Sequence, residues 1–206
     1  KFPYTVGYGM TECGPAIAFD HWQTFRPTSC GRAVDRMEIR IDSPDPFKQV
    51  GEILTKGMNV MDGYYNNPKA SNTVLSPDGW LHTGDLGVLD PDGYLYIKGR
   101  SKSLILGPSG QNIYPEEIED LLNAQPYIAE SLVIEREGKL VALVYPDAEA
   151  MKQNKISREA LLKIIHETRK QINQQIPAYS QIARIEIHDE EFEKTPKRSI
   201  KRFLYQ

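Results

Sequence analysis

Residues 99–119 read GRSKSLILGPSGQNIYPEEIE, and the character of the chain changes across this stretch. Before it, short alternating runs of apolar and polar residues are separated by turn residues, a pattern typical of strands. At its end, a proline at a first helical position is followed by acidic residues, which the helix dipole favours near an N-terminus. We therefore predict a helix over residues 115–123 and a domain boundary between residues 99 and 102.

The first half of the chain, residues 1–100, is rich in strand patterns. The runs RMEIRID (residues 36–42) and GEILTK (residues 51–56) alternate in character. Residues 86–98, LGVLDPDGYLYIK, predict a hairpin whose turn is closed by an Asp-Gly pair. Several short strands punctuated by glycine and proline predict a small barrel or bent sheet, so this half is expected to be a barrel-like subdomain.

The second half, residues 101–206, predicts a small α+β domain. A second hairpin is expected over residues 130–145 around an exposed Glu-Gly turn. A longer helix is expected from Ser157, a good N-cap, towards Gln175, because apolar residues recur at helical spacing. A last alternating strand at 182–188 precedes a basic tail. The predicted fold class of the whole chain is α+β, with a strand-rich subdomain followed by this smaller domain.

The overall composition is that of a globular protein that, taken as a whole, neither attracts nor repels a polyanion. The chain has 206 residues, of which 40% are hydrophobic and 26% are charged, and its net charge is −3. This is enough apolar material for one large domain or two small ones. Because the net charge is negative, no nucleic-acid partner is expected.

The two cysteines, Cys13 and Cys30, have neither CxxC spacing nor clustered histidines, so no structural zinc site is expected. A chain of this size needs no disulfide, and we expect both thiols to be reduced, in the cytoplasm. No apolar run is long enough to span a membrane, and no membrane anchor is encoded in this segment. The opening residues, KFPYTVGYGMTECGP, lack the apolar region of a signal peptide and start inside a strand pattern, so we expect a part of a longer protein.

The densest motif is GYGMTECGP, residues 7–15. Glycines on both sides of Tyr8 let the backbone approach a ligand closely. The hydroxyl of Thr11 can bond a phosphate oxygen, and the carboxylate of Glu12 can hold Mg²⁺ beside it. Taken alone, these residues fit equally well a Gly-rich turn that begins with an N-cap threonine.

A second motif is WLHTGDL, residues 80–86, in which Asp85 follows a Thr-Gly turn. A carboxylate aimed outward from a strand end can accept hydrogen bonds from ribose hydroxyls. An aspartate after glycine is more often an ordinary turn residue, so this motif is weak by itself.

Two further features lie within residues 99–119. A fixed cation at Arg100 could meet a phosphate or a ribose edge. The run from Gly107 to Gly110 predicts a tight loop with exposed backbone donors. The alternative interpretation is a domain linker followed by an ordinary turn into a helix.

The tail EKTPKRSIKR, residues 193–202, holds five basic residues. Such a run is more often a solvated or anion-attracting surface than a catalytic element. A lysine on a flexible loop could, however, swing onto a developing phosphate charge.

The order of these motifs, together with GEILTKGMNVMDGYYNNP at residues 51–68, resembles the C-terminal part of the adenylate-forming superfamily, which includes acyl-CoA synthetases, acyl-adenylating domains and luciferases. The resemblance covers essentially the whole chain, and residues 99–119 are most similar to AMP-forming long-chain fatty-acid–CoA ligases. It implies that residues 1–100 belong to a large adenylating domain and that residues 101–206 are a mobile C-terminal lid domain.

The resemblance also implies a role for each motif residue. Asp85 would accept the ribose hydroxyls with Arg100 beside them, and Lys102 would be the hinge of the lid. Lys201 would neutralise charge during adenylation, although Ile200 stands where the family commonly has glycine; Lys194 and Lys197 are competitors. The remaining implied roles are Tyr8 and Gly9 against adenine, Thr11 on the α-phosphate, Glu12 on Mg²⁺, and Gly107, Ser109 and Gly110 near the pantetheine thiol.

The implied activity is the ATP-dependent conversion of a fatty acid to acyl-adenylate and then to acyl-CoA, with ATP, Mg²⁺ and coenzyme A as cofactors and co-substrates. The family's Gly/Ser/Thr-rich phosphate loop and its acyl pocket are not recognised in the chain and are expected upstream, so the chain alone is expected to be inactive. Two alternatives stay open. One is an adenylation domain that loads a carrier protein, and the other is a non-catalytic scaffold that retains the fold.

Overall fold

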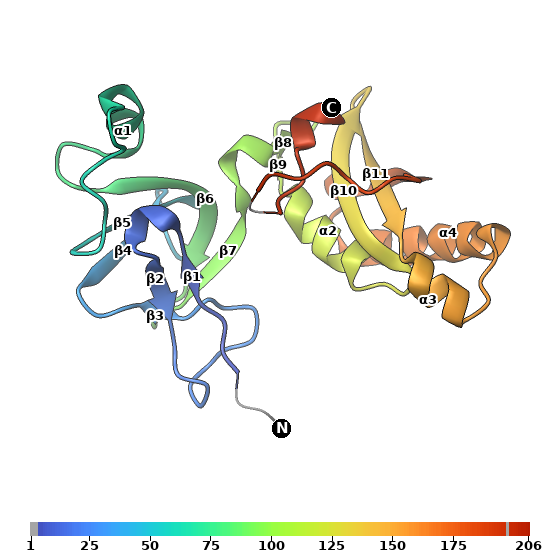
Figure 1. The fold of residues 1–206 in the computed structure, drawn as a ribbon, viewed down its shortest axis with the longest axis horizontal. Coiled ribbons are helices and arrows are strands. Elements are labelled where there is room, and N and C mark those ends of the chain that lie inside the picture. Colours follow the sequence, from blue (N-terminus) through green and yellow to red (C-terminus); the bar gives the residue numbers. More distant parts are fainter. Residues whose placement is uncertain (1–3, 197) are drawn as a thin grey trace. The chain divides into compact units, whose positions relative to one another are not determined.

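The computed structural model describes residues 4–196 and 198–206, which form two compact units. The first unit ends at Lys102 and the second runs from Ser103 to Gln206, so the division lies at the end of the predicted boundary region. Figure 1 shows strands dominating the first unit, whereas helices accompany the sheet of the second.

The main sheet of the first unit is an antiparallel meander in the order β4-β5-β6-β7. The predicted strands at 36–42 and 51–56 and the hairpin at 86–98 are confirmed. At the hairpin turn Gly93 has a φ of +83°, a conformation that glycine adopts without strain. The elements are β4 (Met37–Asp42), β5 (Gly51–Gly57), α1 (Pro68–Val74), β6 (Leu81–Leu89) and β7 (Leu95–Arg100).

A smaller antiparallel sheet has the order β1-β2-β3. It consists of β1 (Tyr8–Gly9), β2 (Ala16–Phe19) and β3 (Arg32–Ala33), with the 3₁₀ turn η1 (Thr11–Cys13) between β1 and β2. The α+β class and the strand-rich first unit are confirmed, but the sheets in the described part of the chain stay open and form no barrel. The first and last strands of the main sheet, β4 and β7, do not pair with each other, so the sheet does not close.

Strand β2 joins the two sheets through its side chains. Successive side chains of a strand point to opposite faces, and the two central residues of β2, Ile17 and Ala18, are both buried. On one face Ile17 packs with Cys13, Met37 and Leu81. On the other face Ala18 packs with Ile41, Ile53 and Leu95. The hairpin that carries residues 8–19 is therefore fixed against the main sheet.

The second unit is built on a three-stranded sheet in the order β10-β11-β12, in which β10 and β11 are antiparallel and β11 and β12 are parallel. The predicted helices are confirmed, and the Ser157 side chain accepts a hydrogen bond from the N–H of Ala160 at 3.1 Å, as expected of an N-cap. None of the described helices is both long enough and apolar enough to cross a membrane. The elements are β8 (Ile105–Leu106), β9 (Asn112–Ile113), α2 (Pro115–Asn123), β10 (Ile128–Arg136), β11 (Lys139–Pro146), α3 (Ala148–Gln153), α4 (Arg158–Gln175) and β12 (Ile182–Ile187), with 3₁₀ turns η2 (Ser101–Ser103) at the boundary, η3 (Ala178–Ser180) and η4 (Arg202–Leu204).

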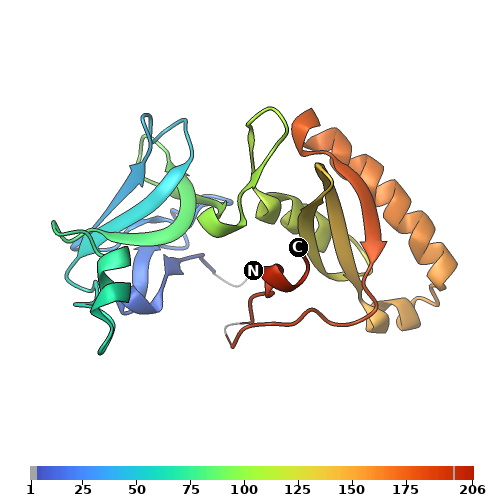
Figure 2. The ribbon, with the colours of Figure 1, turned by 90° about the horizontal axis from the view of Figure 1, so that it is seen from above.

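The two faces of this sheet are covered by different parts of the chain. Figure 2 shows α4 on one side of the sheet and the C-terminal tail on the other. On the helical side, Val133, Ala142 and Val144 pack with Leu122 of α2 and with Leu161 and Ile172 of α4. On the other side, Leu132, Ile134, Val141 and Leu143 pack with Phe192, Ile200 and Tyr205 of the tail. The basic tail is therefore part of the packed structure and not a loose extension.

Both cysteines are free and buried. Burial raises the pKa of each thiol, and that of Cys13 reaches about 11. We expect the native protein to resist alkylation near pH 8, because a pKa of about 11 instead of 9.0 leaves about a hundredfold less thiolate. Iodoacetamide labelling followed by mass spectrometry, with and without urea, measures this. Labelling of either native thiol as fast as in urea would contradict the prediction.

Candidate functional site

The motif at residues 7–15 forms the hairpin β1–η1–β2. The N–H of Met10 donates to the carbonyl oxygen of Pro15 at 2.8 Å and closes the turn. A Cβ atom at Gly9 would lie 2.1 Å from that same carbonyl oxygen, so no other residue fits there without moving the backbone. The close approach of the two strands thus depends on this glycine.

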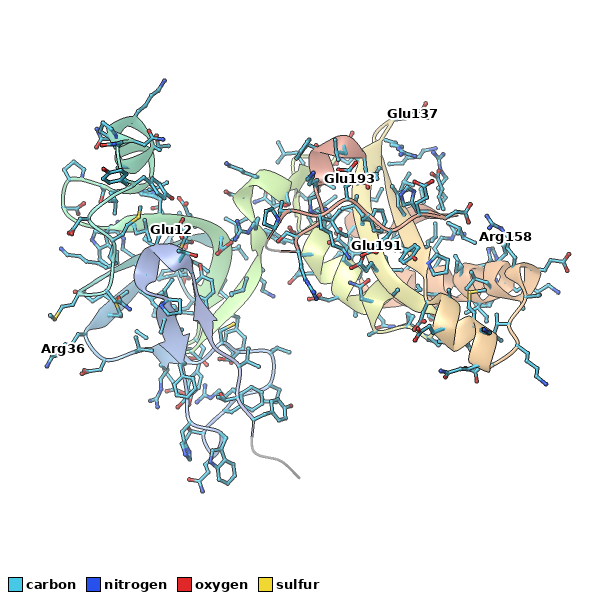
Figure 3. All side chains as sticks on the ribbon, viewed as in Figure 1. Glu12, Arg36, Glu137, Arg158, Glu191 and Glu193 are labelled. Carbon is cyan, nitrogen blue, oxygen red and sulfur yellow. The ribbon has the colours of Figure 1, made fainter. Side chains whose placement is uncertain are left out.

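Glu12 lies on the 3₁₀ turn between β1 and β2 (Figure 3). Its Oε1 accepts a hydrogen bond from Tyr64 Oη at 2.9 Å, and its backbone carbonyl accepts from the N–H of Met61 at 2.8 Å. Burial, together with the bond to Glu12, raises the pKa of Tyr64, which therefore stays a donor. The neighbouring Thr11 is exposed.

The second carboxylate oxygen of Glu12, Oε2, is buried and has no hydrogen-bond partner among the described residues. Leaving such an acceptor unsatisfied costs about 1–3 kcal/mol. Within residues 4–196 and 198–206, no cluster of three or more His, Cys, Asp or Glu side chains could hold a metal on its own. One free carboxylate oxygen nevertheless suits Mg²⁺, which proteins often hold through one or two carboxylates while phosphates and water complete its shell.

Asp85 on β6 is buried and is held from two sides. Its Oδ2 accepts a hydrogen bond from Tyr8 Oη at 2.6 Å, and its Oδ1 lies 2.9 Å from Arg100 Nε. Burial, reinforced by the Asp85 charge, raises the pKa of Tyr8 far above its usual value, so the phenol remains protonated. Arg100 is the register partner of Asp85 across β6 and β7. Tyr8 and Arg100, which come from two other motifs, therefore meet at the carboxylate of Asp85. Each oxygen of that carboxylate can accept a further hydrogen bond.

The turn that carries Asp85 is held by a residue that sequence reasoning missed. Glu52 on β5 accepts the N–H of Gly84 at 2.9 Å through Oε1 and lies 2.9 Å from His82 Nδ1 through Oε2. Gly84 has a φ of +73°, which side chains rarely adopt. Thr83 Oγ1 adds a bond of 2.7 Å to the carbonyl of Ile53. The only sequence feature that could have indicated Glu52 is a carboxylate directly after Gly51 at the start of an otherwise apolar strand.

In the second unit, the loop from Gly107 to Gly110 is the tip of the β8–β9 hairpin. The N–H of Gly107 donates to the carbonyl of Gln111 at 2.8 Å, and Gly110 has a φ of +80°. Ser109 and Gly110 are exposed. A cavity of about 400 Å³ lies beside the hairpin, and its lining includes Leu106, Pro108, Lys139 and Tyr179.

Lys201 lies in the C-terminal tail, directly after Ile200, which packs against the sheet of β10 and β11. Its N–H donates to the carbonyl of Glu193 at 2.8 Å, and its Nζ lies 3.0 Å from Glu193 Oε2. The competing Lys194 is held by two carboxylates, Glu130 at 2.6 Å and Glu191 at 2.5 Å, which raise its pKa. Figure 3 labels Glu191 and Glu193 on the tail. The other competitor, Lys197, lies outside the described residues.

The structure thus brings together Tyr8, Asp85 and Arg100 in the first unit, with Thr11 and Glu12 on the same hairpin as Tyr8. Lys102 is exposed in η2 and is the last residue of that unit. The loop at 107–110 and Lys201 belong to the second unit.

Comparison with known proteins identifies both units. The family model described as AMP-binding enzyme matches residues 2–65, and the AMP-binding enzyme C-terminal domain matches residues 102–205. The chain is 39% identical over 147 residues to 4-coumarate–CoA ligase 5 of Oryza sativa subsp. japonica, covering 65% of this chain and 27% of the relative. It is 37% identical over 138 residues to a long-chain-fatty-acid–CoA ligase of Gallus gallus, covering 66% and 18%.

A solved structure matches both units. O-succinylbenzoate coenzyme A synthetase from Bacillus subtilis, in complex with ATP and magnesium ion, has a TM-score of 0.77 and 29% identity and covers 96% of this chain and 40% of its own. The chain therefore spans well under half the length of the proteins that it matches.

The contacts of Glu52 lead to a stability prediction. Replacing Glu52 by alanine should lower the free energy of unfolding by about 1–2 kcal/mol, because Gly84 loses its acceptor and His82 its partner at a half-buried site. Urea denaturation followed by circular dichroism measures it. The matched control is Glu38→Ala on neighbouring β4, an exposed site where a change below about 0.5 kcal/mol is expected. Equal losses of unfolding free energy in the two variants would contradict a stabilising role of the Glu52 contacts.

Proposed function

This chain belongs to the AMP-binding enzyme family, and from that premise we propose that the protein activates a carboxylic acid with ATP and transfers the acyl group to the thiol of coenzyme A. The observation that carries the proposal is the buried Asp85 carboxylate held between Tyr8 and Arg100. Such a carboxylate is pre-aligned, so it can accept ribose hydroxyls without reorganising.

The remaining nucleotide contacts follow from the same hairpin. We propose that Tyr8 and Gly9 lie against the adenine, because β1 carries them just before Thr11 and Glu12. The exposed Thr11 hydroxyl would donate to an α-phosphate oxygen, and Arg100 would stay beside the ribose.

The unpartnered Oε2 of Glu12 supports a role as a Mg²⁺ ligand. When bound, the ion would neutralise charge on the phosphate oxygens. Tyr64 would hold the carboxylate in place through its bond to Oε1.

The reaction would proceed in two steps. In the first, the substrate carboxylate attacks the α-phosphorus, the bond between the α- and β-phosphates breaks, and pyrophosphate leaves, giving an acyl-adenylate. Lys201 would stabilise the charge that develops on the phosphate oxygens. Among the described residues its ammonium pairs with one carboxylate, that of Glu193, in a partly exposed ion pair that is weak enough to exchange.

In the second step, the thiol sulfur attacks the acyl carbon, AMP leaves, and the thiol proton passes to solvent. We propose that a torsional change at Lys102 rotates the second unit as a lid between the steps. The loop of Gly107, Ser109 and Gly110, of which the last two are exposed, would then approach the pantetheine arm of coenzyme A. Lid motions of this kind commonly separate the steps of a reaction.

A fatty acid is the proposed carboxylic acid substrate, supported by the similarity of residues 99–119 to long-chain ligases and by the long-chain relative. The other relatives are named for 4-coumarate and O-succinylbenzoate, so an aromatic acid is the competing candidate. ATP, the acid and coenzyme A would be the only partners required. The free thiols of Cys13 and Cys30 favour a reducing compartment, and we propose the cytoplasm.

Measurement of acyl-CoA formation tests both the proposed reaction and the proposed role of Lys201. The complete protein is given ATP, Mg²⁺, coenzyme A and a panel of fatty and aromatic acids. We expect acyl-CoA from long-chain acids, and we expect Lys201→Ala to slow adenylation by about 10²–10³-fold, as loss of one charge-stabilising donor does. The matched control is Lys194→Ala, which removes a tail lysine already held by two carboxylates.

The outcomes separate the alternatives. Acyl-adenylate without a coenzyme A product would indicate a carrier-protein acceptor. No adenylate with any acid would leave the non-catalytic scaffold as the explanation. A preference for aromatic acids would keep the reaction class and refute the fatty-acid substrate.

The role of Glu12 gives a separate prediction. Glu12→Gln should raise the Mg²⁺ concentration needed for half-maximal adenylation by at least about tenfold, because a neutral amide is a poor ligand for a hard cation. Titration of pyrophosphate release against Mg²⁺ measures it. Tyr64→Phe keeps the carboxylate and removes only its hydrogen bond, so a smaller shift is expected. An unchanged Mg²⁺ dependence in Glu12→Gln would refute the assignment.

A further inference from the structure

Strand β10 forms an edge of the second unit's sheet, and at one residue of this edge side chains bind both the backbone N–H and the backbone carbonyl. The N–H of Val133 donates to Glu119 Oε1 at 2.6 Å, and the carbonyl of Val133 accepts from Arg202 Nη1 at 3.2 Å. Exposed edge groups are open to pairing with other chains, and here α2 and the tail supply their partners. The tail therefore meets the sheet through a hydrogen bond to its backbone.

The two side chains also bind each other. Arg202 Nη2 lies 2.5 Å from Glu119 Oε2, with Glu116 Oε1 at 3.5 Å. The Arg202 and Glu119 side chains are only 19% and 11% exposed. Each oxygen of Glu119 has a protein partner, and the planar guanidinium joins the carboxylate to the strand carbonyl in one geometry.

Lys201 lies directly before this anchor. On its other side Ile200 packs against the apolar cluster on the sheet face. The Lys201 N–H is bonded to the Glu193 carbonyl, and Glu193 in turn donates its N–H to Tyr205 Oη at 2.8 Å. The backbone at Lys201 is thus held on both sides, while its ammonium pairs with Glu193 at 3.0 Å.

Stability alone is a weak reason for such a pair. A buried ion pair often contributes little net stability compared with apolar side chains of the same volume, since both ions lose their water. What the pair supplies is a fixed position of the tail, because the guanidinium can bond the Glu119 carboxylate and the Val133 carbonyl at once in only one place. Ile200 could slide along an apolar face, whereas Arg202 cannot.

We propose that Glu119 and Arg202 are positioning residues for Lys201: their buried ion pair, locked onto the edge of β10, fixes the point from which the lysine reaches the reacting phosphate. This rests on the proposed function for its catalytic part, since Lys201 acts there in adenylation. The anchoring of the tail is a property of the fold and is tested separately.

Four variants of the complete protein test the proposal. Glu119→Gln and Arg202→Met each break the pair. The double variant removes both charges, so that no unpaired buried ion is left to unfold the protein. Arg158→Gln is the matched control, because Arg158 forms an exposed ion pair with Asp189 in the same unit at 2.6 Å.

Hydrogen exchange, followed by mass spectrometry, measures the anchor directly. We expect residues 199–206 to exchange at least about tenfold faster in the double variant, as in a segment that opens locally. The amides of α4 and of the control variant should keep their wild-type rates. Unchanged exchange in the tail would overturn the anchor.

Separate rates for the two half-reactions test whether the ion pair positions Lys201 for catalysis. We expect the double variant to slow pyrophosphate exchange by about 10–100-fold, the cost of a misplacement of roughly 1 Å. Thioester formation from added acyl-adenylate should stay near the wild-type rate, because Lys201 has no role in it. An equal loss in both half-reactions, or none in the first, would overturn the positioning role.

The two readouts also separate this proposal from the function on which it rests. If the unmodified protein forms no adenylate, the proposed function and the catalytic part fail together, whereas hydrogen exchange still decides the anchor. If adenylation proceeds and the tail is released without any effect on it, the function stands and the positioning role is refuted.

Discussion

A buried carboxylate is tolerated only where hydrogen bonds and opposite charge replace its lost water, and the first unit is arranged around one such group. Asp85 has its two oxygens met by Tyr8 from β1 and Arg100 from β7. One side chain on β6 therefore aligns elements of both sheets. Because burial keeps Tyr8 protonated, the donor does not turn into a competing anion at high pH.

The same constraint recurs in the second unit with a different result. Glu119 is also buried and also has both oxygens engaged, by the Val133 N–H and by Arg202. Its partners are the edge of the sheet and the tail, so the carboxylate joins chain segments. The two arginines differ more than the two carboxylates: the Arg100 side chain is 65% exposed, whereas that of Arg202 is 19% exposed. The ion pair in the second unit is therefore the more enclosed of the two.

Local sequence patterns predicted the individual strands and helices but did not decide whether the strands form a closed barrel or an open sheet. Alternation at 36–42 and 51–56 and the Asp-Gly turn correctly indicated strands, because side-chain direction follows the backbone period. The proline and acidic residues at 115–117 correctly marked a helix start. The alternation left both a small barrel and a bent sheet open, and the barrel is not formed, since closure depends on the number and tilt of paired strands, which no short run of residues encodes.

The candidate site was predictable only where its residues stand in recognisable motifs. Tyr8, Glu12, Asp85 and Arg100 were singled out in this way. Glu52 and Glu119 were not, because their partners Gly84 and Arg202 lie 32 and 83 residues away in the sequence. Arg202 was included in a basic run interpreted as a solvated surface, yet its side chain is among the less exposed of the tail.

By itself, then, the sequence determined which segments are strands and helices, and it placed the hydroxyl, carboxylate and basic residues in their motifs. These properties depend on neighbours within a few residues. Only the tertiary structure decided that Asp85 is held by Tyr8 and Arg100, that one oxygen of Glu12 has no hydrogen-bond partner within residues 4–196 and 198–206, and that the tail is bonded to β10. Those outcomes depend on desolvation, and a side chain loses its water only when residues distant in the sequence fold over it.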